Sequence, residues 1–382
     1  MAGNTEHKVA VVIPTWRRDD LLKNCLQSLG QQTFIDFETV VVSNGAGDQA
    51  ARVAEAAGCA VIRLPSNLGF AAAVNAGIAQ TQPPYVLVLN DDVELDTRWL
   101  ETTVAFLDER PECFYCCGKI FQAGGLLLDN AGDALSLGGS AWRLGHGRPI
   151  HGSRKPGTPT PGSSRFGGAG FGDNDSGDFD LRRPVWAVSG TATLFRRAVF
   201  EKIGLFAEDF FAYLEDMDFS LRAARAGLGG FYLPEATCRH LGSATLGGPD
   251  SPTVIRLLTQ NQLLLLARQF PKGALLRLAP RIVWAQILWA ALAVRKRCFG
   301  AYLKGLAGFL RLLPSALRKR TAWRAEEAQA FRARLASSER EIFADVLAPD
   351  RRDRDTFWRL YFALFPPRGK PEAADGSLRT AP

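Results

Sequence analysis

The chain has 382 residues and a formal net charge of +7, with 47% hydrophobic and 22% charged residues. This length allows two or three structural units with an ample core, and the composition excludes a disordered chain. Seven cysteines, an odd number, and an N-terminal stretch without an apolar run argue against a secreted disulfide scaffold, so we expect reduced thiols in the cytoplasm.

Short apolar strands alternate with helical segments through the first part of the chain. We expect strands over residues 8–14, 38–42, 60–64 and 85–89, separated by helices over residues 19–29, 49–58 and 70–79. This alternation predicts an α/β fold with a mostly parallel sheet and helices on both faces. Ligands bind such sheets at the carboxyl ends of the strands, so polar residues that follow a strand are site candidates.

The second part of the first 250 residues is less regular. Residues 152–177 are dense in Gly, Pro, Ser and Thr, which predicts a mobile segment. A strand-like run over residues 185–195, a short helix over 198–203 and an apolar strand over 230–238 follow it.

Asn90, Asp91 and Asp92 directly follow the strand over residues 85–89. Carboxylate oxygens at a strand end suit Mg²⁺ or Mn²⁺ bound together with a substrate phosphate. An ordinary turn is the alternative, because Asn and Asp are common turn formers. No P-loop or dinucleotide-binding signature follows the first strand. The segment 67–69 opens a helix and is either a phosphate site or a simple cap.

An acidic cluster lies among Phe, Tyr, Leu and Met side chains and consists of Glu215, Asp216 and Asp218. Carboxylates that repel one another in apolar surroundings have raised pKa values, as a general base requires. Pairing with Arg222 or Arg225 along a helix is the structural alternative. We expect one catalytic carboxylate and one structural partner. His240 follows a later strand and is either structural or directed into the same crevice as Asp92.

The charge of the chain divides sharply near residue 250. Residues 1–250 hold 22 basic and 29 acidic side chains, whereas residues 251–382 hold 24 basic and 10 acidic ones. The apolar run 282–294 is too short to cross a bilayer alone. Basic residues recur every seven positions from Arg297 to Arg318, with leucines on other parts of the same surface.

This pattern predicts basic amphipathic helices that lie in a membrane interface, separated at Pro280 and Pro314. A basic helical region packed on the first domain is the alternative. Nucleic acid is disfavoured as a partner, because the aromatic residues lie within apolar runs instead of forming a stacking platform.

Seven motifs occur in a familiar order between residues 8 and 250: PTWRRDDL, VVVSNGAGD, SNLGFAAAVNAGI, YVLVLNDDVEL, VSGTATLFRRAVFEKIGLF, FFAYLEDMDFSLRAARAG and RHLGSATLG. Together they resemble family-2 glycosyltransferases of the rhamnosyltransferase-like group. The resemblance implies a GT-A domain over residues 1–250, and the charge pattern described above predicts a membrane-associating region over residues 251–382. The resemblance also implies an inverting enzyme on the inner face of the cell membrane. Such an enzyme transfers sugar from a nucleotide-diphosphate sugar to a glycan or lipid-linked hydroxyl during polysaccharide synthesis.

The same resemblance implies roles for individual residues. Asp216 matches the general base, beside Glu215, and Asp92 and His240 match ligands of a divalent cation, Mg²⁺ or Mn²⁺. The nucleotide-sugar positions are Pro14, Thr15, Arg18, Ser43, Asn67, Gly69, Asn75, Asn90 and Asp91. The acceptor positions are Trp186, Gly190 and Asp218, and residues 175–180 resemble a loop near the acceptor.

Two departures from the family pattern keep other functions open. Ser43 stands where an Asp usually contacts the base, and Ala72-Ala73 stands where Gly is frequent. A non-catalytic nucleotide-sugar-binding scaffold subunit at the membrane is therefore one alternative. A nucleotidyltransferase is another, although a basic Gly-rich phosphate loop is missing after the first strand.

Overall fold

The computed structural model describes residues 7–45, 47–149, 179–242, 247–248, 250–351 and 355–367. The predicted mobile segment 152–177 lies outside these ranges, as does most of the loop 175–180. The N-terminal elements follow the predicted alternation: β1 (Val9–Thr15), α1 (Asp19–Leu29), β2 (Phe37–Asn44), α2 (Asp48–Ala56), β3 (Ala60–Leu64), α3 (Phe70–Ala79) and β4 (Tyr85–Leu89). Every residue of β1 and β4 is buried, as expected for strands covered on both faces.

The central sheet has the strand order β10-β12-β6-β11-β4-β1-β2-β3. Its later strands are β5 (Val93–Leu95), β6 (Cys113–Gln122), β10 (Arg183–Val185), β11 (Ala192–Arg196) and β12 (Gly229–His240). Strands β3, β2, β1 and β4 are parallel, as are β6 and β12, whereas β11 joins the two groups in the antiparallel direction. Strand β5 pairs with the end of β12, so His240 lies opposite Val93 and close to the end of β4.

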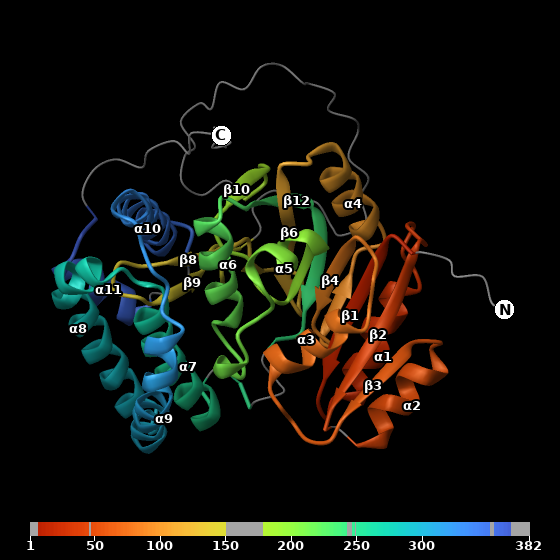
Figure 1. Cartoon of the computed structure of the whole chain (residues 1–382), viewed down its shortest axis with the longest axis horizontal. Helices are drawn as coiled ribbons and strands as arrows, with labels where there is room; N and C mark the ends of the chain where they lie inside the picture. Colours follow the sequence, from red (N-terminus) through yellow and green to blue (C-terminus); the bar gives the residue numbers. More distant parts are fainter. Residues whose placement is uncertain are drawn as a thin grey trace.

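Helices cover both faces of the sheet, as predicted (Figure 1). Helices α1, α2 and α4 (Trp99–Glu109) contribute to one apolar cluster, and α3, α5 (Arg197–Ile203) and α6 (Glu215–Arg225) contribute to the other. Helix α1 shows why: Leu22, Cys25, Leu26 and Leu29 recur at helical spacing and are buried against the sheet.

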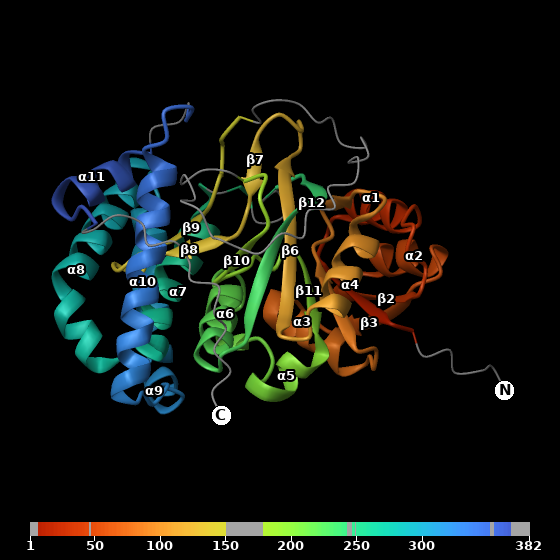
Figure 2. The ribbon, with the colours of Figure 1, turned by 90° about the horizontal axis from the view of Figure 1, so that it is seen from above.

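The C-terminal region is helical and forms a separate layer beside α6 (Figure 2). Its helices are α7 (Pro252–Gln269), α8 (Lys272–Arg295), α9 (Phe299–Arg318), α10 (Ala325–Val346) and α11 (Thr356–Leu364). Buried leucines of α7 share an apolar cluster with Leu214, Met217 and Leu221. The division of the chain at residue 250 remains a proposal.

The predicted helix breaks at Pro280 and Pro314 are wrong. Pro280 lies inside α8 and Pro314 inside α9, and both prolines are exposed. Each ring removes a single backbone hydrogen bond on the outer side of its helix and meets no packed neighbour there. The helices from α7 to α10 are separated instead at residues 270–271, 296–298 and 319–324. Pro271 lies at the first of these breaks and precedes α8 with extended backbone angles.

Candidate active site

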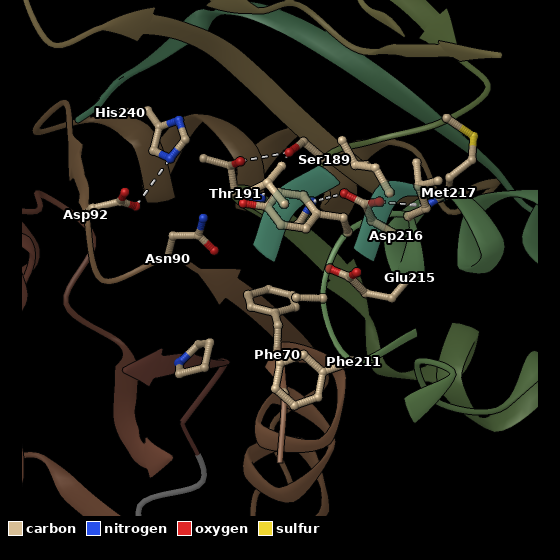
Figure 3. A pocket seen from close by; sticks show the side chains of 18 of the residues that line it. Phe70, Asn90, Asp92, Ser189, Thr191, Phe211, Glu215, Asp216, Met217 and His240 are labelled. Atoms are coloured by element: carbon tan, nitrogen blue, oxygen red, sulfur yellow. Dashed lines mark hydrogen bonds and ion pairs between the residues drawn. The ribbon is translucent and has the colours of Figure 1, made fainter. Parts of the chain in front are cut away.

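A cavity of about 450 Å³ opens at the carboxyl ends of β1 and β4 and extends to α6 and α7. The predicted site residues that line it are Pro14, Thr15, Asn67, Gly69, Asn90, Asp91, Asp92, Gly190, Glu215, Asp216 and His240. Asp92 and His240 lie on one side, and Glu215 and Asp216 lie on the other (Figure 3). The strand pairing explains this convergence, because β12 pairs with β5, which directly follows the end of β4, and β11 pairs with β4 itself.

His240 is held between two carboxylates. Its Nε2 atom lies 3.2 Å from Oδ1 of Asp92, and its Nδ1 atom lies 2.8 Å from Oδ2 of Asp129. Burial lowers the pKa of the imidazole, but hydrogen bonds to Asp129 and Asp92 outweigh this effect and raise the pKa to about 9. Asp129 also accepts a 2.6 Å hydrogen bond from Nη1 of Arg143, so its orientation is fixed from two directions.

The oxygen atoms at the end of β4 fit a divalent cation. Oδ1 of Asn90 and Oδ2 of Asp91 are buried and have no hydrogen-bond partner, and the equally buried Oδ1 of Asp92 faces Nε2 of His240. Buried oxygens in this state are costly unless a cation or donor satisfies them. No group of three or more His, Cys, Asp or Glu side chains poised for a metal occurs among the described residues. Mg²⁺ needs only one or two protein ligands when substrate phosphates and water complete its shell.

The two carboxylates at the start of α6 differ in environment. Asp216 accepts backbone hydrogen bonds from Gly190 at 2.9 Å and from Met217 at 2.8 Å. Burial raises its pKa above the ordinary value, and these hydrogen bonds oppose the increase. Burial and the nearby Asp216 charge raise the pKa of Glu215 further, and its Oε2 atom has no partner. These environments make Asp216 the stronger acid of the pair, and Glu215 the group that holds its proton more readily.

Two predicted site residues have structural partners outside the cavity lining. Asp218 is fully buried and accepts hydrogen bonds from Nε of Arg222 at 2.9 Å and Nε2 of Gln269 at 2.7 Å. Two residues along a helix correspond to a rotation of about 200°, which turns Asp218 away from the side of Asp216. Asn75 bonds the backbone N and O atoms of Phe206 at 3.0 and 2.9 Å.

Three further predicted residues also lie outside the cavity lining. Trp186 packs edge-on against Phe331 of α10, with ring centroids 6.1 Å apart. Ser43 is buried, and strand alternation directs the next residue, Asn44, into the cavity in its place. The Arg18 guanidinium lies 3.6 Å from the carboxylate of Asp20.

Sequence reasoning missed a hairpin that closes the cavity. It comprises β8 (Asp133–Leu135) and β9 (Ala141–Arg143), and its cavity-lining residues are Asp133, Ala141, Trp142, Arg143 and the following His146. Burial and the charge of Asp216 raise the pKa of Asp133 to about 7. The hairpin strands are three residues long, too short for a recognisable alternation, and nothing local indicates that they face α6.

The family model for glycosyl transferase family 2 matches residues 10–204. The N-acetylglucosaminyl-diphospho-decaprenol L-rhamnosyltransferase of Mycobacterium tuberculosis is 28% identical over 245 residues, which are 60% of this chain and 75% of that protein. The uncharacterized protein y4gI of Sinorhizobium fredii is 28% identical over 253 residues, 64% of this chain. The match spans only 25% of the y4gI protein.

Solved structures resemble the chain in fold. S. aureus TarS 1–349 in complex with UDP-GlcNAc aligns with a TM-score of 0.50 at 17% identity, covering 88% of this chain and 91% of that one. GalNAc-T7 with UDP, GalNAc and Mn²⁺ aligns with a TM-score of 0.53 at 12% identity, covering 82% and 58% respectively. These similarities confirm the predicted GT-A fold and, at such identities, concern the fold alone.

Proposed function

The chain belongs to glycosyl transferase family 2, and from this premise we propose that it is an inverting, cation-dependent enzyme with a glycan or lipid-linked acceptor. Membership makes the chain a glycosyltransferase that uses nucleotide sugars. The observation that carries the finer proposal is the single cavity that joins Asp92 and His240 to Asp216 (Figure 3). A leaving diphosphate needs cation ligands on one side of the sugar, and an attacking hydroxyl needs a base on the other side.

Asp216 is the residue that we assign to the proton transfer. As the acceptor hydroxyl attacks the anomeric carbon, its proton passes to a carboxylate oxygen of Asp216. The hydrogen bonds from Gly190 and Met217 hold that carboxylate in place. One displacement inverts the anomeric configuration and requires no enzyme nucleophile. Asp92 would hold the cation, together with the neutral imidazole of His240 once Nε2 has given up its proton, and the cation would stabilise the negative charge that grows on the departing diphosphate.

The proposal is tested with purified protein and a panel of UDP-, GDP- and dTDP-sugars that includes a rhamnose donor. Mn²⁺-dependent hydrolysis or transfer with at least one donor is the expected result. Donor binding without any turnover would favour the scaffold subunit instead. The rhamnose donor is included because the mycobacterial relative is an L-rhamnosyltransferase.

The pH dependence of the reaction should follow the protonation of Asp216. A base works only when deprotonated, and burial raises the pKa of Asp216 above that of an exposed aspartate. We therefore expect kcat/KM to fall as the pH decreases through this raised pKa. Rates measured between about pH 5 and 9 at saturating Mn²⁺ test this expectation. A pH-independent rate, or the same acid limb in Asp216→Asn, would contradict it.

The outer surface of the C-terminal helices supports the proposed membrane contact. Leu303, Leu310 and Leu317 of α9 are 49%, 63% and 51% exposed. Each leucine is followed directly by an exposed basic residue, so that apolar and basic stripes run side by side: Lys304, Arg311 and Arg318. On the neighbouring α8, Leu276, Val283, Ile287 and Val294 are also exposed. Apolar side chains flanked by basic ones suit the interface of an anionic bilayer.

Helix α8 is long and apolar enough to cross a membrane by length and composition alone, and only 17% of its most apolar window is buried. The predicted apolar run of 282–294 therefore underestimated the length of this helix, which spans 24 residues. We propose that α8 and α9 lie on the membrane, because both helices share one end of the molecule, opposite α2 (Figure 1). The active site would then work at the inner surface of the cell membrane.

Neutralising two of these charges should weaken membrane binding. We expect the double variant Lys304→Gln/Arg311→Gln to bind anionic liposomes about 30-fold more weakly, since each basic residue contributes about 1 kcal/mol. Lys23→Gln/Arg52→Gln removes the same charge from exposed positions on α1 and α2 and should change binding less than threefold. Equal losses in both double variants, or no binding by the unmodified protein, would contradict the proposal.

A further inference from the structure

The loop between the short helix at Glu208–Phe210 and α6 has an unusual backbone. Phe211, Tyr213 and Leu214 have φ values of 64°, 69° and 67°, in the left-handed region that residues with side chains avoid. Leu214 is also the residue from which α6 begins, and Glu215 and Asp216 follow it directly. Strain of this kind persists only where surrounding contacts hold the backbone in place.

One side chain of α7 supplies such contacts. The amide Nδ2 of Asn261 donates to the carbonyl oxygens of Phe210 at 2.9 Å, Ala212 at 2.8 Å and Tyr213 at 2.7 Å. Asn261 is completely buried. An amide group has two N–H hydrogens, so the three carbonyls share both of them. Without this group the carbonyls would turn away to find other donors, and the left-handed conformation would relax.

The opposite side of the loop meets the start of α3. Phe211 O accepts a hydrogen bond from Ala71 N at 3.3 Å. A Cβ atom on Gly69 would lie 2.4 Å from the same oxygen, and Gly69 itself has a φ of +92°. Only glycine allows this approach. The loop is therefore fixed between the donor side of the cavity and the C-terminal helices.

We propose that Asn261 is a positioning residue for catalysis, through which the C-terminal helices set the location of Asp216 in the cavity. Asn261 does not itself line the cavity, and it acts through the loop 210–214, whose residues 211–214 do. A second bond from the same helix, from Gln269 to Asp218 at 2.7 Å, ties the next turn of α6 to α7. This inference rests on the proposed function, because it assigns Asn261 to the reaction in which Asp216 is the base.

The test is the variant Asn261→Leu, which keeps the size of the side chain and removes both N–H groups. We expect kcat to fall about 100-fold, as a small misplacement of a catalytic group does, with the donor KM within about threefold of the unmodified protein. Hydrogen exchange of the amides in residues 210–216 should become faster. The matched control is Thr259→Val, a buried isosteric change on the same helix that leaves the loop untouched and should leave kcat unchanged.

A kcat within threefold of the unmodified protein, unchanged exchange in residues 210–216, or an equal loss in Thr259→Val would overturn the inference. If Asn261→Leu is not recovered folded, Asn261→Asp gives the same test with a polar side chain of equal size. The donor is whichever UDP-, GDP- or dTDP-sugar supports turnover in the panel. If none does, the proposed function fails, and the exchange measurement still decides whether Asn261 holds the loop.

Discussion

The variant Asp216→Asn should lose sugar transfer almost completely, with a fall in kcat of about 1,000-fold or more. Asparagine has nearly the same shape and keeps one of the two backbone hydrogen bonds that Asp216 accepts, since only its Oδ1 atom can accept from an N–H. The amide has no basic oxygen with which to take the proton of the acceptor hydroxyl. Donor affinity, measured by calorimetry with Mn²⁺ present, should stay within about threefold of the unmodified protein.

Glu215→Gln is the matched control for this loss. Burial and the charge of Asp216 raise the pKa of Glu215, which favours the protonated form of its carboxyl group. Replacement by Gln preserves the size and imitates that neutral form, and we expect a fall in kcat of less than about tenfold. Residual turnover above a tenth of normal in Asp216→Asn would remove Asp216 as the base. A larger loss of kcat in Glu215→Gln than in Asp216→Asn would mean that Glu215, and not Asp216, is the base.

The parts of the fold that depend on local pattern were predictable. Strand β4 and helix α3 have the predicted bounds, because an unbroken apolar run and a small-residue helix each carry their own signal. Asn90-Asp91-Asp92 was found for the same reason, since the motif immediately follows β4. The motif order predicted the GT-A fold as a whole through resemblance to a known family, but it placed none of the elements between residues 93 and 143.

The remaining features depend on contacts between distant parts of the chain. The orientation of His240 toward Asp92 depends on the pairing of β12 with β5, and the bond to Asp129 depends on the pairing of β7 (Leu128–Asn130) and β12 with β6. The strands of the β8–β9 hairpin have only three residues each, too few to show an alternating pattern in the sequence. In the sequence, Asn261 is an ordinary polar residue within a helical segment. Its role is visible only in the structure, where it donates hydrogen bonds to the carbonyls of Phe210, Ala212 and Tyr213. Such roles arise from tertiary structure and leave no local sequence signal.

The contacts of α7 show that the change in net charge near residue 250 does not coincide with a boundary between independent parts of the structure. Net charge separates a slightly acidic part from a strongly basic one. Helix α7 belongs to the basic part by sequence, yet Asn261 and Gln269 bond the loop and helix that carry Glu215 and Asp216. Its cavity-lining residues are Val254 and Leu258. A protein cut at residue 250 would therefore lose support for the catalytic loop together with the proposed membrane contact.

The variant Asp92→Ala should abolish the dependence of donor binding on Mn²⁺. Asp92 supplies a buried carboxylate that lies in the cavity beside His240, which makes it the strongest candidate ligand at the end of β4. Changes in groups that merely support a ligand cost 10- to 100-fold in metal affinity, so loss of the ligand itself should cost about 100-fold or more. Mn²⁺ affinity in the presence of UDP, GDP or dTDP, followed by electron paramagnetic resonance, measures this effect independently of turnover.

Asp96→Asn is the control for Asp92→Ala, because Asp96 lies just beyond β5 and does not line the cavity. Its replacement should leave Mn²⁺ affinity unchanged. Asp92→Asn is a second control. It keeps an oxygen near His240 but removes the negative charge, so it separates loss of the cation ligand from loss of the His240 contact. If charge and coordination matter, Asp92→Asn should weaken Mn²⁺ binding nearly as much as Asp92→Ala does. Unchanged Mn²⁺ dependence in both Asp92 variants would mean that the cation is held elsewhere, and that Asp92 serves only to orient His240.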